Sequence, residues 1–444
     1  MPKPLLLIIS LFIFLPGAAQ HRWTLQECID YAHSHNITLQ KLNCQQATYD
    51  TQLSEARAAW LPSMSAALNE GATWRPFQES TVNFVNGGMA ATAAKKTTES
   101  GSYGLNAGWT LYNGGQRKLN IQSATLQQQR GLLSVEEQKN ALTEQIAQLY
   151  VQILYMQEAL RVNEEVVHQD SLIWQRGVQF MECGKLARAS VQELEATLAS
   201  GRYDLVNTRT QIAQAQLQLA QLLELPAGET IEILSTPTDT EVLQALPDQQ
   251  SVYAEALRTR PEIKGAELAT QQSRLATRIA RAARIPTVSL NAGINDSHMT
   301  GAATSAGKQL RSNLNAVAGV AINIPLLDQR RTRSSIERAQ IGELNAQLDL
   351  ADAQKELYQR IAQYWLTAHN SQQKYQASQS NVQSRTASHE LLQEQFNVGL
   401  KNISDLLQSR AALLISQQTL LQDKYNALLH RSLLNFYTGS PLKL

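Results

Sequence analysis

The stretch that decides the fold is Ala58–Pro62 (AAWLP), because it returns 224 residues further on as Ala282–Pro286 (AARIP). At the same separation, Leu39 matches Ile263. Each stretch ends in a proline, which cannot continue a helix and biases its predecessor towards extended geometry. Pro62 and Pro286 are therefore expected to mark two equivalent boundaries between a helix and a strand.

A second part of the chain repeats at a separation of 215 residues. Leu111–Asn113 matches Leu326–Asp328, and Gly184 matches Gly399. A unit of about 200 residues is far longer than the 20–50 residues of solenoid repeats. The chain is therefore predicted to hold two equivalent halves, residues 20–226 and 251–444, joined by an irregular, proline-containing linker at 227–250.

The N-terminus resembles a secretory signal peptide, residues 1–19, with a basic residue, an apolar segment and a cleavage site of small residues. No later segment offers 18 consecutive apolar residues, so an exported protein without a membrane-spanning helix is expected. The first of three cysteines is Cys28, well past the cleavage site, so nothing marks a lipid-anchored N-terminus. An odd count of three cannot form a disulfide framework.

Composition argues against several classes of function. The net charge is +1, which gives no indication of a nucleic-acid partner. No phosphate-binding loop, nucleophile elbow or paired-carboxylate constellation is present, so an enzyme is not expected. The same survey predicts no cofactor and no metal site.

Four long segments are predicted to be helices. Apolar residues at 142, 146, 149, 153, 156 and 160 follow the heptad rhythm of a coiled coil, and proline is absent from 115 to 176. The four segments are about 115–176, 190–223, 331–395 and 404–436. Helices of this length do not fit a compact globule, so a bundle or tube is expected.

Four short segments alternate instead with a period of two, at about 63–74, 102–112, 287–296 and 312–324. Alternation of apolar with small or polar residues is typical of membrane β-strands. The polar loops Arg75–Gly101 and Asp296–Arg311 join each pair, and the longer first loop explains the slip from 224 to 215. Four aromatic residues near strand ends are candidates for an interfacial belt: Trp74, Tyr103, Trp109 and Tyr112.

Four strands cannot close a barrel, and an open edge in lipid leaves unpaired backbone groups. Three copies would supply 12 strands, which predicts a homotrimer embedded in lipid. The fold class predicted is thus mainly α with membrane β. The alternative is an exported structural or adaptor-like coiled coil without a pore.

With these features together, the chain resembles the TolC-family outer-membrane efflux channels of Gram-negative bacteria. The resemblance rests on the tandem repeat, on both proline stretches, on Pro325–Asp328 (PLLD) and on Phe396–Leu400 (FNVGL) at a helix–helix turn. It implies a homotrimer with a 12-stranded barrel in the outer membrane and a long periplasmic helical tunnel. It also implies a passive duct for efflux or type I secretion, docked on a periplasmic adaptor protein and served by an inner-membrane pump of RND or ABC type.

The resemblance also implies functional residues around the helix–helix turn of the second half, at Phe396–Leu400, called here the second turn. Val398, Gly399 and Leu400 would form the adaptor-docking tip. The first copy keeps the glycine, Gly184, but has Cys183 and Lys185 beside it, which puts docking by the first copy in doubt.

Asp405 would ring the periplasmic entrance and favour cations. Alternatively, Asp405 is simply a residue in the first turn of a helix capped by Ser404. Gln408 stands where the family often has a second aspartate, and Lys401 and Phe396 flank the turn where gate contacts occur in the family.

Overall fold

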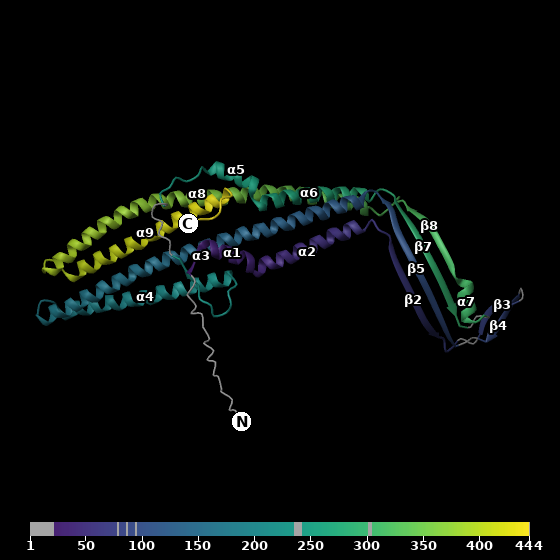
Figure 1. Ribbon diagram of the computed structural model, residues 1–444, viewed down its shortest axis with the longest axis horizontal. Coiled ribbons are helices and arrows are strands. Elements are labelled where there is room, and N and C mark those ends of the chain that lie inside the picture. Colours follow the sequence, from purple (N-terminus) through teal and green to yellow (C-terminus); the bar gives the residue numbers. More distant parts are fainter. Residues whose placement is uncertain are drawn as a thin grey trace, which may run out of the picture. The chain divides into compact units, whose positions relative to one another are not determined.

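The computed structural model describes residues 22–77, 80–85, 88–93, 96–234, 242–300 and 304–443 (Figure 1). The expected signal peptide, residues 1–19, lies outside the described residues. None of the described helices is both long enough and apolar enough to cross a membrane.

The duplication expected from the sequence is confirmed helix by helix. Helices of 11, 22, 67 and 35 residues occur in the same order in both copies. The first two pairs start 224 residues apart and the last two pairs 215 apart. The first copy has α1 (Leu25–His35), α2 (Ile37–Ala58), α3 (Gln116–Glu182) and α4 (Arg188–Leu222); the second has α5 (Gln249–Thr259), α6 (Pro261–Ala282), α8 (Arg331–Asn397) and α9 (Ile403–Tyr437).

Local capping explains why the short first helices begin where they do. The Thr24 hydroxyl accepts the Glu27 N–H, and the Glu27 carboxylate accepts the Thr24 N–H at 2.8 Å, which forms a capping box. In the second copy the Asp248 carboxylate accepts the Ser251 N–H at 3.0 Å. The hydrogen bonds lower the pKa of Asp248, so its carboxylate stays ionised at the helix N-terminus.

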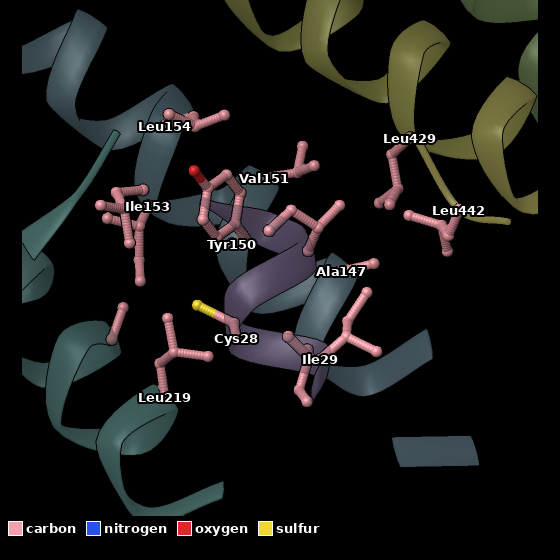
Figure 2. Packing of buried hydrophobic residues seen from close by; sticks show 14 of the residues in the cluster. Cys28, Ile29, Ala147, Tyr150, Val151, Ile153, Leu154, Leu219, Leu429 and Leu442 are labelled. Atoms are coloured by element: carbon pink, nitrogen blue, oxygen red, sulfur yellow. The ribbon is translucent and has the colours of Figure 1, made fainter. Parts of the chain in front are cut away.

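The described chain forms two compact units. The first comprises the described residues of Met1–Cys44, Leu133–Lys264 and Ala351–Leu444. Its core packs α1 against α3, α4 and α9 (Figure 2). Cys28 is completely buried there, and burial raises the pKa of its thiol to about 12, so this cysteine is an inert packing residue.

Tyr150 in this core makes hydrogen bonds that hold the predicted linker, 227–250, against the helices. The Tyr150 hydroxyl lies 3.1 Å from the carbonyl oxygen of Trp23 and 2.8 Å from that of Leu234. These carbonyls flank a short parallel pair, β1 (Arg22–Trp23) and β6 (Glu232–Ile233). The linker is thus not wholly irregular, because β6 pairs with β1.

The second unit, Gln45–Leu132 and Gly265–Leu350, contains a four-stranded sheet. Its order is β2-β5-β7-β8 and every pair is antiparallel. The strands are β2 (Ser63–Trp74), β5 (Thr97–Asn113), β7 (Thr287–Met299) and β8 (Asn315–Asn323). Pro62 and Pro286 directly precede β2 and β7, as the sequence predicts, and α2 and α6 end four residues before them.

The structure corrects the expected loops and strand bounds. Arg75–Gly101 contains the hairpin β3 (Ser80–Val85) and β4 (Gly88–Ala93), and its last residues already belong to β5. Likewise β7 continues to Met299. The expected strand start at 312 is wrong, because 312–313 end the helix α7 (Ala306–Asn313).

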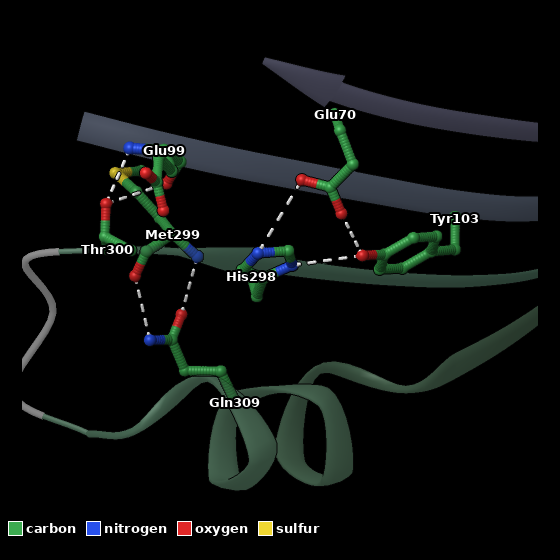
Figure 3. A network of polar contacts seen from close by, with 7 residues as sticks. All are labelled: Glu70, Glu99, Tyr103, His298, Met299, Thr300 and Gln309. Carbon is green, nitrogen blue, oxygen red and sulfur yellow. Dashed lines mark hydrogen bonds and ion pairs between the residues drawn. The ribbon is translucent and has the colours of Figure 1, made fainter. Parts of the chain in front are cut away.

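A buried glutamine explains why a helix forms there. Gln309 accepts the Met299 N–H at 2.9 Å and donates to the Met299 carbonyl at 2.9 Å (Figure 3). It therefore acts as a substitute strand partner for the end of β7 and anchors the helix to the sheet.

Candidate functional site: a two-faced sheet and two helical turns

The register of the sheet places apolar residues on one face in all four strands. Leu68 lies opposite Tyr103, Leu105 opposite Ile294, and Ala292 opposite Ala318. Side chains alternate between faces along a strand, so these pairs also fix the face of every other residue in the regular parts of the four strands. The apolar face contains Met64, Ala66 and Leu68 of β2, Leu105, Ala107 and Trp109 of β5, Leu290, Ala292 and Ile294 of β7, and Ala318, Val320 and Ile322 of β8.

The opposite face is small and polar. Ser65 lies opposite Asn106, which lies opposite Gly293, and Asn291 lies opposite Gly319. Both edge strands are fully exposed along their length. A sheet with one apolar face and one polar face is suited to separate lipid from water.

A β-bulge in β5 determines which face of the sheet carries one residue of the expected aromatic belt. The register of β5 shifts between Thr110 and Tyr112, so Leu111 has no partner and Tyr112 lies opposite Val288. An extra residue in one strand shifts the alternation by one position. Trp109 and Tyr112 therefore both face the apolar side at the end nearest the helices, and Tyr103 and Trp74 face it towards the other end.

The end of the sheet far from the helices carries a polar cluster on this same face. The Tyr103 hydroxyl donates to the Glu70 carboxylate, and His298 Nε2 lies 3.8 Å from that carboxylate (Figure 3). The Tyr103 and His298 rings are stacked with centroids 5.9 Å apart. Gly101 lies beneath them, and a Cβ there would be 2.3 Å from the His298 ring. The cluster thus links three strands where the apolar face ends.

The two long hairpins turn through the same backbone motif. After α8, the Leu400 N–H donates to the Gln395 carbonyl at 2.9 Å and the Gly399 N–H to the Phe396 carbonyl at 3.0 Å. After α3, Lys185 and Gly184 make the equivalent pair of bonds. This is the Schellman motif, which needs a left-handed residue. Gly399 has φ 78° and Gly184 φ 71°.

Replacement of Gly399 by alanine is expected to destabilise the turn by about 1 kcal/mol. The added Cβ would meet no atom, so the cost is that of a left-handed backbone. Gly342→Ala, in the interior of α8 and equally uncrowded, is expected to stabilise the helix by about 0.5–1 kcal/mol. Hydrogen exchange of the amides of residues 395–405 and 338–346 measures both. Equal effects of the two changes would contradict this account of the turn.

The second turn exposes apolar side chains and the first does not. Val398 is 71% and Leu400 76% exposed. Their counterparts Cys183 and Lys185 are also exposed, but only the second copy offers two large apolar groups to a partner.

The N-cap of α9, just after the second turn, is not the residue that the sequence suggested. The cap of α9 is Asn402, whose side chain accepts the Asp405 N–H at 2.8 Å. Ser404 lies within the helix, so the expected cap at Ser404 is wrong. The Asp405 carboxylate, 39% exposed, lies 3.5 Å from the Lys401 ammonium group. Gln408 is exposed one turn further along, where it continues the face that carries Asp405.

Phe396 is a packing residue in this chain. It is 6% exposed and packs in a cluster with Ile173, Leu194, Ile403 and Leu406. Arg176 of α3 adds a hydrogen bond of 2.7 Å to the Asn397 side chain. The two hairpins are therefore joined at their turns, which leaves Val398 and Leu400 exposed beyond the packed cluster.

A buried ion pair that sequence reasoning missed joins the same hairpins. Arg410 of α9 donates to the carboxylate of Asp170 of α3; their side chains are 14% and 3% exposed. Burial raises the pKa of Asp170, against the attraction of Arg410. Gly201 of α4 lies against the pair. The two residues are 240 positions apart, so no sequence motif indicates that they meet.

The ion pair borders a groove of about 550 Å³ between α3, α8 and α9. His389 in its wall lies 2.9 Å, Nδ1 to Oγ, from Ser409. Burial and the nearby Arg410 cation lower the pKa of His389, which keeps this ring neutral at pH 7. Among the described residues, no group of three or more metal-ligating side chains comes together.

Comparison with known proteins identifies the class. The model of the outer membrane efflux protein family matches residues 28–224 and again 252–440, once in each copy. The chain therefore belongs to the outer membrane efflux protein family, and it is an efflux channel protein of the outer membrane.

Individual relatives are distant but cover most of the chain. The outer membrane efflux protein BepC of Brucella suis is 21% identical over 93% of this chain and 84% of its own. The cation efflux system protein CusC of Escherichia coli is 24% identical over 74% of this chain and 70% of its own.

Solved structures share the fold. A crystal structure of CusC has a TM-score of 0.79 at 18% identity, covering 94% of this chain and 92% of that one. The outer membrane protein VceC of Vibrio cholerae has a TM-score of 0.76 at 17% identity, covering 94% and 97%. The long helices with a few strands are thus the fold of outer-membrane channels.

Proposed function

We propose that three copies of the chain close a 12-stranded barrel, continued by a tube of their long helices, and that this duct carries cargo passively across the outer membrane. The observation that carries the proposal is the two-faced sheet with unpaired edges at β2 and β8. Unpaired backbone groups in lipid are costly, so each edge needs a strand from another copy.

Strand directions are compatible with closure. Since β2 leaves α2 and β8 returns to α8, the β8 of one copy would lie antiparallel to the β2 of the next, like every pair within the chain. A barrel of about eight strands is filled by its own side chains. Two copies would therefore leave no passage, and three are the smallest number that forms a duct.

The second turn is the proposed docking site for a periplasmic adaptor that couples the duct to an inner-membrane pump of RND or ABC type. Val398 and Leu400 are exposed apolar groups on a turn that lies over a packed cluster. This arrangement suits insertion into an apolar groove of a partner.

Asp405, with Gln408 beside it, is proposed to line the constriction at the periplasmic entrance. Three copies would bring three carboxylates together around one axis, and a ring of carboxylates favours cations over anions. Lys401 offsets part of this charge within each chain, so the proposed ring is weakly acidic.

Asp405→Ala is expected to reduce the cation-over-anion permeability ratio of single channels in planar bilayers by about twofold or more, because each subunit loses one negative charge at the constriction. The matched control is Asp349→Ala, an exposed carboxylate of α8 far along the helix from the turn. Its ratio should stay at the wild-type value. Equal ratios for the wild type and Asp405→Ala would contradict the assignment of the constriction.

A further inference from the structure

The junction between sheet and helices carries far more positive charge in the second copy than in the first. Residues 274–284 and 328–343 hold eight arginines and three carboxylates, a net charge of +5. The equivalent residues of the first copy, 50–60 and 113–128, hold three basic and two acidic residues, a net charge of +1. The fold is shared, so the fold alone does not require this excess.

These arginines lie at one end of the sheet. Thr287, the first residue of β7, pairs with Asn323, the last residue of β8. The end of α6 leads directly into β7, and β8 leads into the turn before α8. The arginines of both segments are exposed: Arg274, Arg278, Arg281, Arg284, Arg330, Arg331, Arg333 and Arg338.

Little of this charge is neutralised within the chain. Glu337 pairs with both Arg330, at 3.3 Å, and Arg333, at 3.1 Å. The Asp328 carboxylate instead accepts hydrogen bonds from the Thr332 side chain and from the Thr332 N–H, the latter at 2.7 Å, and these bonds lower the pKa of Asp328. Within the described part of the chain, no carboxylate lies within 4 Å of Arg281, Arg284 or Arg331.

The first copy uses its equivalent positions differently. Arg117 is buried, stacks 4.5 Å from the Trp60 ring and donates to the Ala59 carbonyl at 3.3 Å. The second copy has Arg284 in place of Trp60 and Thr332 in place of Arg117. Its basic groups are therefore directed to solvent rather than into the chain.

Backbone conformation adds an independent observation. Gln329 and Arg330 have φ 53° and 66°, whereas the equivalent residues Gly114 and Gly115 have φ 65° and 82°. Glycine adopts this geometry without a steric penalty. The second copy thus keeps an arginine side chain at a strained position where glycine would be relaxed, and such strain is commonly found at functional sites.

The charged segment adjoins exposed apolar residues. Leu326 and Leu327, between β8 and α8, are 89% and 96% exposed. They follow Ile322 along the chain, at the end of the sheet where Trp109 and Tyr112 lie. Apolar groups followed by exposed cations are expected where a membrane leaflet meets its headgroups.

We propose that this basic collar, Arg281, Arg284, Arg330 and Arg331 with Leu326 and Leu327, binds anionic phospholipid headgroups of the leaflet nearest the helices. The inference rests on the proposed membrane function of the sheet. A neighbouring subunit would bring the segment before β2 to the β8 edge, but residues 50–62 of that segment carry Asp50, Glu55 and Arg57, a net charge of only −1 against the +5 of the junction. Lipid phosphates, unlike that segment, complement the charge.

Quenching of tryptophan fluorescence by brominated lipids tests the proposal on the whole mature protein in vesicles. Trp60 and Trp109 lie at the same end of the sheet as the collar. Wild-type protein should bind brominated phosphatidylglycerol at least about fivefold more strongly than brominated phosphatidylcholine, the contribution of one basic side chain at an anionic surface. Raising the salt concentration should reduce this preference, because salt screens exposed charges.

The variant that removes the collar is Arg281→Gln with Arg284→Gln and Arg331→Gln. It should bring the preference close to one. The control, Arg188→Gln with Arg202→Gln and Arg385→Gln, makes the same charge change at exposed positions of α4 and α8 and should leave the preference unchanged.

The outcomes separate the two proposals. Insertion with normal conductance but no phosphatidylglycerol preference in the wild type would overturn the collar and keep the duct. A collar variant that no longer forms oligomers but keeps its preference for phosphatidylglycerol would assign these residues to contacts between subunits. That result would also overturn the inference. Failure of the wild-type protein to insert would overturn the proposed membrane function and the collar with it.

Discussion

Arginine at Ala292 is expected to prevent stable membrane insertion, whereas arginine at the adjacent Asn291 is expected to be tolerated. Ala292 lies in the middle of the apolar face, opposite Ala107 and Ala318, and Asn291 lies on the polar face, opposite Gly108 and Gly319. An arginine on the lipid face near the middle of a bilayer costs about 2–4 kcal/mol. An arginine on the face towards water is hydrated.

The pair of variants forms its own control, because the two positions are neighbours on one strand and receive the same side chain and charge. The free energy of unfolding from lipid vesicles, obtained by urea titration, measures the difference. Ala292→Arg should be less stable than Asn291→Arg by at least about 2 kcal/mol. Equal stabilities, or a larger loss at Asn291, would reverse the assignment of the two faces.

The second large effect is expected at the buried ion pair. Asp170→Ala would leave the Arg410 guanidinium buried with no counter-ion, and loss of one partner of such a pair costs about 3–5 kcal/mol. The Arg410 Nε has no hydrogen-bond partner among the described residues, so the carboxylate is its main compensation. Replacing both residues together, Asp170→Leu with Arg410→Met, should restore most of the stability.

An exposed pair on the same helix provides the comparison. Arg209 of α4 lies 2.8 Å from Glu164 of α3, with side chains 59% and 46% exposed. Glu164→Ala should cost no more than about 1 kcal/mol. If Asp170→Ala costs as little as Glu164→Ala in the same urea titration, the buried pair does not hold the hairpins together.

The sequence predicted the repeated helices well because their signals are local and long. The heptad rhythm and the absence of proline extend over tens of residues, and the two separations of 224 and 215 residues recur in the starts of the helices. The left-handed geometry at Gly399 could also be predicted, since a glycine between two helical patterns is the usual terminator.

The errors arose where a tertiary contact decided the local structure. The helix α7 replaces the expected start of β8 because Gln309 binds the backbone of Met299. The bulge at Leu111 depends on how β5 meets β7, which the alternation along one strand does not indicate.

The features of the candidate site that could not be predicted from the sequence also depend on tertiary contacts or on backbone geometry. Asn402 and Ser404 are both acceptable caps by type, and only the backbone decides between them. Asp170 and Arg410 come from different copies of the repeat, so their pairing needs the packing of α3 against α9 to be known. The basic collar could be found by counting charges in the two copies, but its exposure could not.

The most direct test of the duct is the mass of the assembled protein, extracted from the outer membrane in mild detergent and measured by native mass spectrometry. The account predicts a particle of three mature chains, since three sheets of four strands are needed to close the barrel around a passage. A monomer, a dimer or an open-ended series of masses would contradict it.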